Sequence, residues 1–182
     1  MPLLSTPMTI VRPADSSELD AVVEVLHTAH REFADTLPSA VYAAYIANLI
    51  DVHSRLAASE LLVAELDDRL AGTITVYPDA SDEGWGWPAH WAGLRAIAVA
   101  PDARGRGLGR QLAAAAIARA RDLDREAICL HTAHFMRAAV PLYQSLGFQR
   151  CPDYDQDVSA LFGVSPVGDP MLAIGYSLRL EP

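Results

Sequence analysis

Arg104-Gly105-Arg106-Gly107-Leu108-Gly109 follows an apolar run, Leu94 to Val99, and opens an alanine-rich stretch with helical character. The segment therefore marks the place where a strand ends and a helix begins. Glycine lets a backbone come close to a ligand, and the free N–H groups of a helix's first turn, aided by the helix dipole, bind phosphate. We predict that residues 104–110 form a cradle for a pyrophosphate.

Two other nucleotide-binding patterns do not fit this segment. A dinucleotide fingerprint that starts at Gly105 needs a third small residue where Arg110 stands. The next strand-like run, Ala127 to Thr132, also ends without the carboxylate that would bind a ribose. A Walker A loop needs a lysine, and the chain contains none. Both patterns are therefore excluded.

The pattern that does fit is Arg-x-x-Gly-x-Gly, formed by Arg104, Gly107 and Gly109 and preceded by the apolar segment 94–101. A second landmark, A-x-x-L-Y-x-x-x-G-F, follows at residues 139–148. The two motifs in this order resemble the GCN5-related N-acetyltransferase superfamily. The resemblance covers roughly residues 9–151.

This resemblance implies an α/β (α+β) fold, with a central mixed, mostly antiparallel twisted sheet and helices on both faces. We expect residues 1–7 to be disordered and residues 8–182 to form a single domain. Helices are predicted to start near Asp15 or Ser16 and to cover 39–58, 107–123 and 135–146. The predicted strands are 9–12, 61–66, 69–77, 91–99, 127–132, one beginning at Phe148, and 171–180.

Composition limits the possible partners. A chain of 182 residues that is 51% apolar is long enough for one domain with an ample core. Its formal net charge of −9 disfavours binding to nucleic acid, which rests on clustered positive charge. The N-terminus has no secretory pattern and no apolar run is long enough to cross a membrane, so we expect a cytoplasmic protein without membrane contact. A homodimer is left open.

The resemblance also implies that acetyl-CoA is the co-substrate. Strands 91–99 and 127–132 would splay apart, and backbone groups of Ile97, Ala98 and Val99 would hold the pantetheine arm in the gap. Met136 stands where many members have asparagine, and it would pack against the arm instead. The pyrophosphate would meet the N–H groups of Arg104, Gly105, Arg106, Gly107, Leu108, Gly109 and Arg110. The alternative for the glycines is a plain turn before a helix.

Tyr143 is the candidate catalytic residue of the second motif. In the family a tyrosine at this place points its hydroxyl at the thioester sulfur. The pKa of tyrosine is about 10 and that of a thiol about 8.5, so full proton transfer to the thiolate is uphill by about 2 kcal/mol. We therefore expect Tyr143 to donate a hydrogen bond to the leaving thiolate. The alternative is a tyrosine of the core.

The residue that removes the amine proton is not where the resemblance places it. Many relatives carry a glutamate on the strand that enters the cradle, at the position of Gly93, and no carboxylate replaces it on that strand. Glu83 and His90 are the nearest candidates for a catalytic base in the sequence. Each could instead be a solvated loop residue, with water carrying the proton out.

Three tryptophans, Trp85, Trp87 and Trp91, fall within seven residues, in the loop 78–90 or at its edge. Because aromatic faces attract cations and acidic residues precede the tryptophans, we predict a substrate mouth for a positively charged amine. The alternative is a cluster that covers the sheet edge or a subunit contact.

No metal is expected, because His131 and His134 fit no four-ligand spacing and attack on a thioester needs none. We predict direct transfer of an acetyl group from acetyl-CoA to the primary amine of a small-molecule acceptor. One alternative is a protein acetyltransferase acting on an N-terminus or a lysine. Another is a non-catalytic acyl-CoA-binding module, for which Gly93 is the argument.

Overall fold

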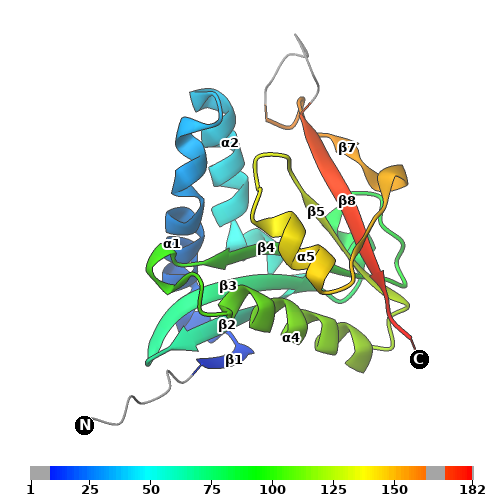
Figure 1. Cartoon of the computed structure of the whole chain (residues 1–182), viewed down its shortest axis with the longest axis horizontal. Coiled ribbons are helices and arrows are strands. Elements are labelled where there is room, and N and C mark those ends of the chain that lie inside the picture. The colour runs from blue at the N-terminus through cyan, green and yellow to red at the C-terminus, as the bar shows by residue number, and fades with distance from the viewer. Residues whose placement is uncertain (1–8, 163–170, 182) are drawn as a thin grey trace.

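The computed structural model describes residues 9–162 and 171–181, so the segment 1–7, expected to be disordered, lies outside the described residues. The strands run in the order β1-β2-β3-β4-β5-β8-β6, and β7 pairs with β8 (Figure 1). All pairs are antiparallel except β4 with β5. The bounds are β1 Thr9–Pro13, β2 Glu60–Leu66, β3 Arg69–Tyr77, β4 Ala92–Val99, β5 Ala127–Thr132, β6 Gln149–Arg150, β7 Gln156–Asp157 and β8 Leu172–Arg179.

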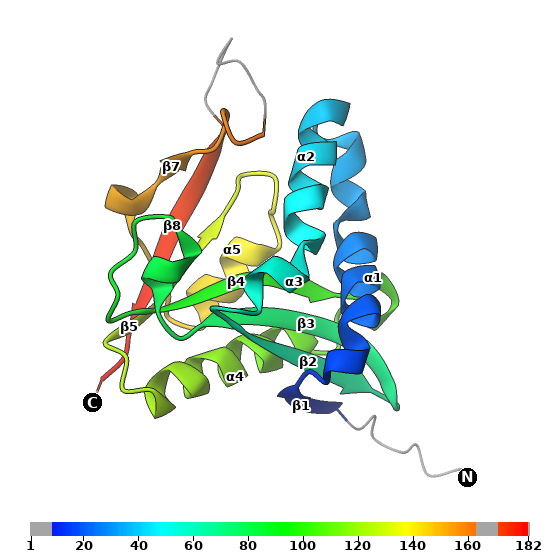
Figure 2. The same ribbon diagram turned by 180° about the vertical axis from the view of Figure 1, so that it is seen from behind.

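Helices cover both faces of this sheet (Figures 1 and 2). On one face lie α1 (Leu19–His30), α2 (Ser39–Ile50) and α3 (Val52–Arg55), and on the other lie α4 (Leu108–Asp122) and α5 (Ala139–Ser145). The mixed, mostly antiparallel fold predicted from the sequence is therefore confirmed. None of the helices in the described ranges is long and apolar enough to cross a membrane.

The helix that follows the glycine-rich segment packs by its small residues. In α4 the buried positions recur at helical spacing and half of them are alanine, so the helix axis can lie close to the sheet. These residues join the core on the α4 side of the sheet, whereas α1 and α2 build a second core on the opposite side. The buried side chains of α4 are Leu108, Leu112, Ala113, Ala116, Ile117 and Ala120.

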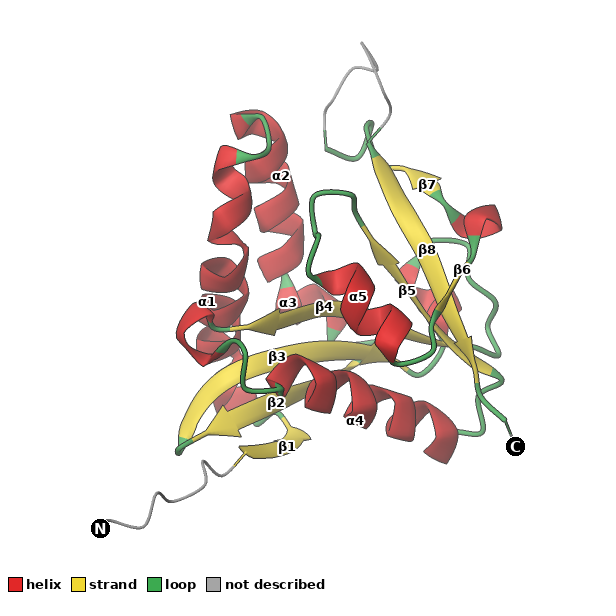
Figure 3. Cartoon of the chain, in the orientation of Figure 1, coloured by secondary structure: helices red, strands yellow, loops and turns green. Residues whose placement is uncertain are grey.

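Two predicted helices have different bounds in the structure. The helix expected over 39–58 divides at Asp51, whose ψ of 66° is not helical and whose carboxylate caps α3 by accepting from Ser54 N. The helix expected over 135–146 begins only at Ala139, and residues 133–138 form a connection (Figure 3). Pro141 explains the late start, because proline fits the first turn of a helix but breaks its interior.

Strands β4 and β5 separate after a short contact. They pair only at Ala92 with Ile128 and at Gly93 with Cys129. On its other side β4 carries a bulge, because the register against β3 shifts between Arg95 and Ala98. Ala96 lies in this bulge with a φ of 54°, a left-handed conformation that a Cβ disfavours. The splay that the family resemblance implies is present, and strain at Ala96 accompanies it.

We expect Ala96→Gly to keep the free energy of unfolding within about 0.5 kcal/mol of the wild-type value or to raise it, because glycine adopts this φ without steric cost. Ala98→Gly is the matched control. Ala98 is buried beyond the bulge, and losing its methyl group and adding chain entropy should cost about 1 to 2 kcal/mol. Urea unfolding compares the two variants, and equal losses would contradict a strained bulge.

Candidate active site

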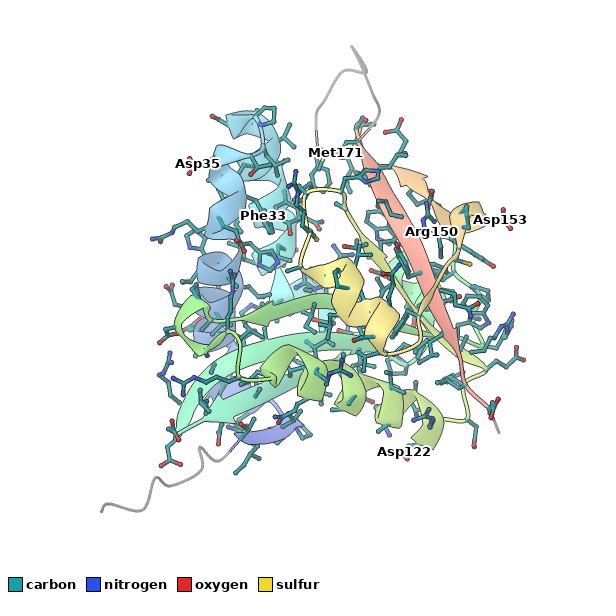
Figure 4. The ribbon with its side chains drawn as sticks, viewed as in Figure 1. Phe33, Asp35, Asp122, Arg150, Asp153 and Met171 are labelled. Atoms are coloured by element: carbon teal, nitrogen blue, oxygen red, sulfur yellow. The ribbon has the colours of Figure 1, made fainter. Side chains whose placement is uncertain are left out.

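A cleft of about 1140 Å³ opens where β4 and β5 separate. Its lining includes the C-terminal end of α1, the second half of β4, the segment 133–139 and the start of β8. Figure 4 labels two of its lining residues, Phe33 after α1 and Met171 before β8, which lie on opposite sides of the opening. The lining also includes Leu108 and Tyr143 of the core on the α4 side and Tyr45 and Phe162 of the core on the α1 side, so the cleft reaches both cores.

The glycine-rich segment, which the sequence predicts to be a pyrophosphate cradle, lines this cleft. Gly105 and Gly107 have φ values of 75° and 83°, which favour glycine. A Cβ at Gly105 would have no heavy atom within 4 Å, and one at Gly107 would meet only Gln111 Nε2 at 3.9 Å. The first hydrogen bond of α4 runs from Gln111 N to Gly107 O at 3.0 Å, so the N–H groups of residues 108–110 have no partner within the helix. Open space before free N–H groups fits a phosphate.

Of the seven residues predicted for the cradle, six line the cleft and Arg106, which is exposed, does not. Arg104 is anchored to α1, since it donates to Ala29 O at 2.7 Å and pairs with Glu32 at 2.9 Å. Arg110 donates to Ser145 Oγ at 2.7 Å. The cradle is thus tied to α1 on one side and α5 on the other. The six lining residues are Arg104, Gly105, Gly107, Leu108, Gly109 and Arg110.

The residues predicted along the pantetheine arm also line the cleft. Ile97, Ala98 and Val99 lie on β4 where its edge facing β5 is no longer paired. Val99 O accepts from Arg104 Nε at 3.4 Å, and the other backbone groups on this edge are available to an extended ligand. Met136 lines the cleft from the 133–138 connection, and its sulfur accepts a weak hydrogen bond from Thr132 Oγ1 at 3.7 Å.

Tyr143 reaches the cleft from α5 and is 3% exposed. Its ring lies 5.7 Å from the ring of Phe148, so both residues of the second motif pack in the same core. Burial raises the pKa of the Tyr143 hydroxyl above its usual value. The hydroxyl therefore stays protonated at neutral pH and can donate a hydrogen bond.

Glu83 lines the cleft from a short 3₁₀ turn, Ala80–Glu83, and its side chain is 4% exposed. Arg95 Nη1 donates to its Oε1 at 3.3 Å, whereas the buried Oε2 has no hydrogen-bond partner among the described residues. Burial raises the pKa of Glu83 to about 7, because it outweighs the attraction of Arg95 and Arg55. A carboxylate with this pKa can accept a proton at neutral pH.

The same turn explains why Gly93 carries no side chain. A Cβ on Gly93 would lie 3.3 Å from Tyr77 Cβ and 3.6 Å from Cα and Cβ of Ala80. A longer side chain at this position would have to displace the turn that ends in Glu83. The turn packed over Gly93 instead brings a carboxylate, that of Glu83, to Arg95 of β4.

His90 does not reach the cleft. Its ring is exposed, with Nε2 3.2 Å from Glu126 Oε2, and it is absent from the lining residues. Backbone pairing accounts for this position, since Glu126 N donates to His90 O just before β5 begins. We therefore retain only Glu83 as the candidate base.

The three tryptophans do not form one mouth. Trp85 lines the cleft, but Trp87 and Trp91 are buried in a separate cluster with Tyr154, whose ring stacks on Trp87 at 4.4 Å. The cation nearest Trp85 belongs to the chain itself, because Arg95 Cζ lies 5.8 Å from its ring centroid. The predicted site for a positively charged amine on three aromatic faces is therefore absent from this arrangement.

His131 lines the cleft as a fixed, neutral side chain. Nε2 lies 2.7 Å from Tyr154 O and Nδ1 accepts from Trp87 Nε1 at 3.3 Å, so the proton sits on Nε2. Burial lowers the pKa of this imidazole. With both nitrogens engaged, His131 cannot serve as the base. Among the described residues, no three metal-ligating side chains gather into a site for an ion.

Sequence reasoning missed most of one wall of the cleft. We call it the α2-side wall, and it consists of Phe33, Tyr45, Asn48, Glu83, Trp85 and Arg95. Asn48 holds Arg95, whose Nη2 donates to its Oδ1 at 2.5 Å. Tyr45 is 8% exposed, and its hydroxyl is buried without a hydrogen-bond partner in the described part of the chain. The one available signal was Arg95, a charge on an otherwise apolar strand.

Known acetyltransferases are similar to this chain in sequence. The model of the acetyltransferase (GNAT) family matches residues 19–148. A probable N-acetyltransferase camello from Xenopus tropicalis is 34% identical over 108 residues, which cover 57% of this chain and 46% of that protein. The mycothiol acetyltransferase of Cellulomonas flavigena is 34% identical over 112 residues, 60% of this chain and 30% of that protein. The matched segments thus span less than half the length of either relative.

Among solved structures, yncA from Salmonella typhimurium, a putative acetyltransferase with its cofactor acetyl-CoA, has a similar fold. It is 20% identical, with a TM-score of 0.65 over 95% of this chain and 94% of the other. At this identity the likeness concerns the fold.

We expect Gly107→Asp to abolish binding of acetyl-CoA, because a carboxylate would occupy the open space before the free N–H groups and repel a pyrophosphate. Gly86→Asp is the control for backbone strain, since Gly86 has a φ of 79° and a Cβ added there would have no heavy atom within 4 Å. Calorimetry and the ligand-induced rise in melting temperature measure binding. Wild-type affinity in the Gly107 variant would contradict the cradle.

Proposed function

This chain belongs to the acetyltransferase (GNAT) family, and from that premise we propose that it transfers an acetyl group from acetyl-CoA to the primary amine of a small molecule. The family uses acetyl-CoA. One observation carries the proposal, namely that a buried carboxyl group with a pKa of about 7 and a protonated tyrosine line the same cleft as the cradle.

The residues present suit acetyl-CoA. The cradle offers N–H groups to the pyrophosphate, and the unpaired edge of β4 at residues 97–99 offers backbone groups to the pantetheine arm. When bound, acetyl-CoA supplies the thioester whose acetyl group is transferred. The thioester would lie in the gap between β4 and β5, between the two cores.

Glu83 acts as the general base in this proposal. An ammonium ion has no lone pair, so the amine must lose a proton before or during its attack. Glu83 takes that proton, the nitrogen lone pair forms a bond to the carbonyl carbon, and the bond from this carbon to sulfur breaks. As the bond to sulfur breaks, the nitrogen loses a second proton, which passes through solvent to the departing thiolate. The products are an amide, the thiol of CoA and a protonated Glu83, which then returns its proton to solvent.

Tyr143 stabilises the departing thiolate. Its hydroxyl is protonated and buried, and a hydrogen bond to a developing charge is strong where water is excluded. Glu83 and Tyr143 come from opposite faces of the sheet, so the proton acceptor and the proton donor can lie on the two sides of one reacting carbon.

The α2-side wall favours a small molecule over a protein acceptor. Glu83 is 4% exposed, so the reacting amine must enter the cleft to reach it. A lysine on a folded protein could bring its amine that far only by inserting its whole side chain between the aromatic walls. Retention of both Glu83 and Tyr143 in the cleft also argues against a module that only binds acyl-CoA.

Tyr143→Phe should lower kcat about tenfold or more while the dissociation constant of acetyl-CoA stays the same, since only a hydrogen bond made to leaving thiolate is lost. Tyr42→Phe, a half-buried tyrosine of α2 outside the cleft lining, is the control. Thiol release with a confirmed acceptor measures turnover. An unchanged kcat would contradict a catalytic role for Tyr143 and indicate that it only packs in the core.

Glu83→Gln should lower kcat/KM by about 10²- to 10⁴-fold at pH 8 and remove a rise of kcat/KM with pH. The wild-type rise is expected near pH 7, because the base acts in its deprotonated form and burial sets the pKa of Glu83 at about 7. Arg95 and Arg55 attract this carboxylate, and Tyr77 stays neutral because burial raises its pKa.

The acceptor amine titrates in both enzymes, so the difference between the two pH profiles isolates Glu83. Glu83→Gln should keep its affinity for acetyl-CoA, as checked by calorimetry. If the variant keeps the wild-type profile, another group is the base, and His30, a buried histidine of the cleft lining, is the next to test.

A further inference from the structure

We propose that the acceptor is an α-amino acid with a large apolar side chain, whose ammonium and carboxylate groups are recognised by Glu83 and Arg95. This inference rests on the proposed acetyl transfer and names the acceptor class of that site. It follows from the pairing of Glu83 with Arg95 on the α2-side wall, whose other residues are aromatic or carry an amide.

Glu83 and Arg95 are the two charged side chains of the α2-side wall. They lie side by side, with Oε1 and Nη1 3.3 Å apart, and are 4% and 17% exposed. The remaining charged residues of the cleft lie elsewhere, in the 3₁₀ turn after α1, in the cradle and on the 133–138 connection; they are Glu32, Arg104, Arg110 and Arg137. An acceptor bound at this wall therefore meets one negative and one positive group.

Both charged groups have capacity left for a ligand. Oε2 of Glu83 is buried and has no partner among the described residues. Arg95 donates to Glu83 and Asn48, which leaves further N–H groups of its guanidinium without a hydrogen bond to the described residues. A buried acceptor atom without a partner is costly, and an incoming ammonium would satisfy it.

The spacing of these groups matches a zwitterion. In an α-amino acid the nitrogen and the carboxylate carbon are bonded to the same atom and lie roughly 2.5 Å apart. Its two charges can therefore meet Glu83 and Arg95 together. Asn48 and the Trp85 ring hold Arg95 in place from two sides, and a fixed guanidinium binds a carboxylate in a defined orientation.

Aromatic residues of the cleft determine which side chain the acceptor can carry. Phe135 lies edge-on to Phe33 at 5.0 Å and to Tyr45 at 5.8 Å between ring centroids, and all three line the cleft. An apolar side chain placed among these rings gains buried area and edge-to-face contacts. A second cationic group on the acceptor, as in a diamine, would face Arg95 without a further acid on the wall.

The test compares four acceptors with the wild-type enzyme. L-phenylalanine carries both charges and a ring, L-phenylalaninamide and 2-phenylethylamine lack the carboxylate, and L-alanine lacks the ring. We expect kcat/KM, measured by thiol release, to be about tenfold to hundredfold higher for L-phenylalanine than for the other three. Calorimetry in the presence of CoA should show the same order of binding, independently of turnover.

Variants of Arg95 show whether this residue recognises the carboxylate of the acceptor or only positions Glu83. Arg95→Gln should lower kcat/KM for every acceptor to some extent, because Arg95 also contacts Glu83, but it should lower kcat/KM for L-phenylalanine about tenfold more than for L-phenylalaninamide or 2-phenylethylamine and so remove the preference. Arg95→Lys should restore part of the preference. If Arg95 only positions Glu83, all acceptors will lose activity by the same factor in Arg95→Gln, and this result would overturn the proposal.

Failure of this inference differs from failure of the proposed function. Equal kcat/KM for the three phenyl compounds in the wild type overturns amino-acid recognition while acetyl transfer stands. Binding of L-phenylalanine with CoA, but no thiol release from acetyl-CoA, supports the inference and overturns the enzyme. Absence of both binding and turnover for L-phenylalanine, with any other amine accepted, overturns the inference alone.

Discussion

The separation of β4 from β5 is the constraint on which the site depends. Two parallel strands that stayed paired along their length would close the sheet and leave no passage between its two cores. Here the pairing stops after Gly93 and Cys129, and the bulge at Ala96 turns β4 away. Figure 3 shows β4 and β5 diverging, and the unpaired edge of β4, the glycine-rich segment and the α2-side wall line the cleft between them.

Features encoded locally were predictable from the sequence. The cradle is one uninterrupted segment whose glycines occupy left-handed conformations, and the Tyr143 motif is another, so both could be read in order. Tyr45 and Asn48 could not be identified in this way, because a residue lining a cleft from a helix shows the same spacing as a core residue. Asn48 contacts Arg95, which is distant in sequence and lies beside it only in the folded chain, and Tyr45 lines the same cleft.

The incorrect predictions also have local physical reasons. His90 is close to Glu83 in sequence, but backbone pairing with Glu126 directs it to the residues that precede β5. Residues close in sequence can point in different directions when turns separate them. Glu83 ends the turn that packs over Gly93, and this places it in the cleft. The helix that carries Tyr143 begins later than its periodicity indicated, because Pro141 is tolerated only near a helix start.

Local charge, not net charge, decides what this cleft binds. The chain carries a formal charge of −9, which would repel CoA and an acidic acceptor at long range. Screening limits that repulsion to about 8 Å at physiological ionic strength, whereas the cleft presents four arginines against two glutamates at contact distance. Burial then has a different effect on each member of the Glu83–Arg95 pair. It strengthens the field of Arg95 toward a carboxylate, and it raises the pKa of Glu83 to where the carboxyl group can take a proton from an amine.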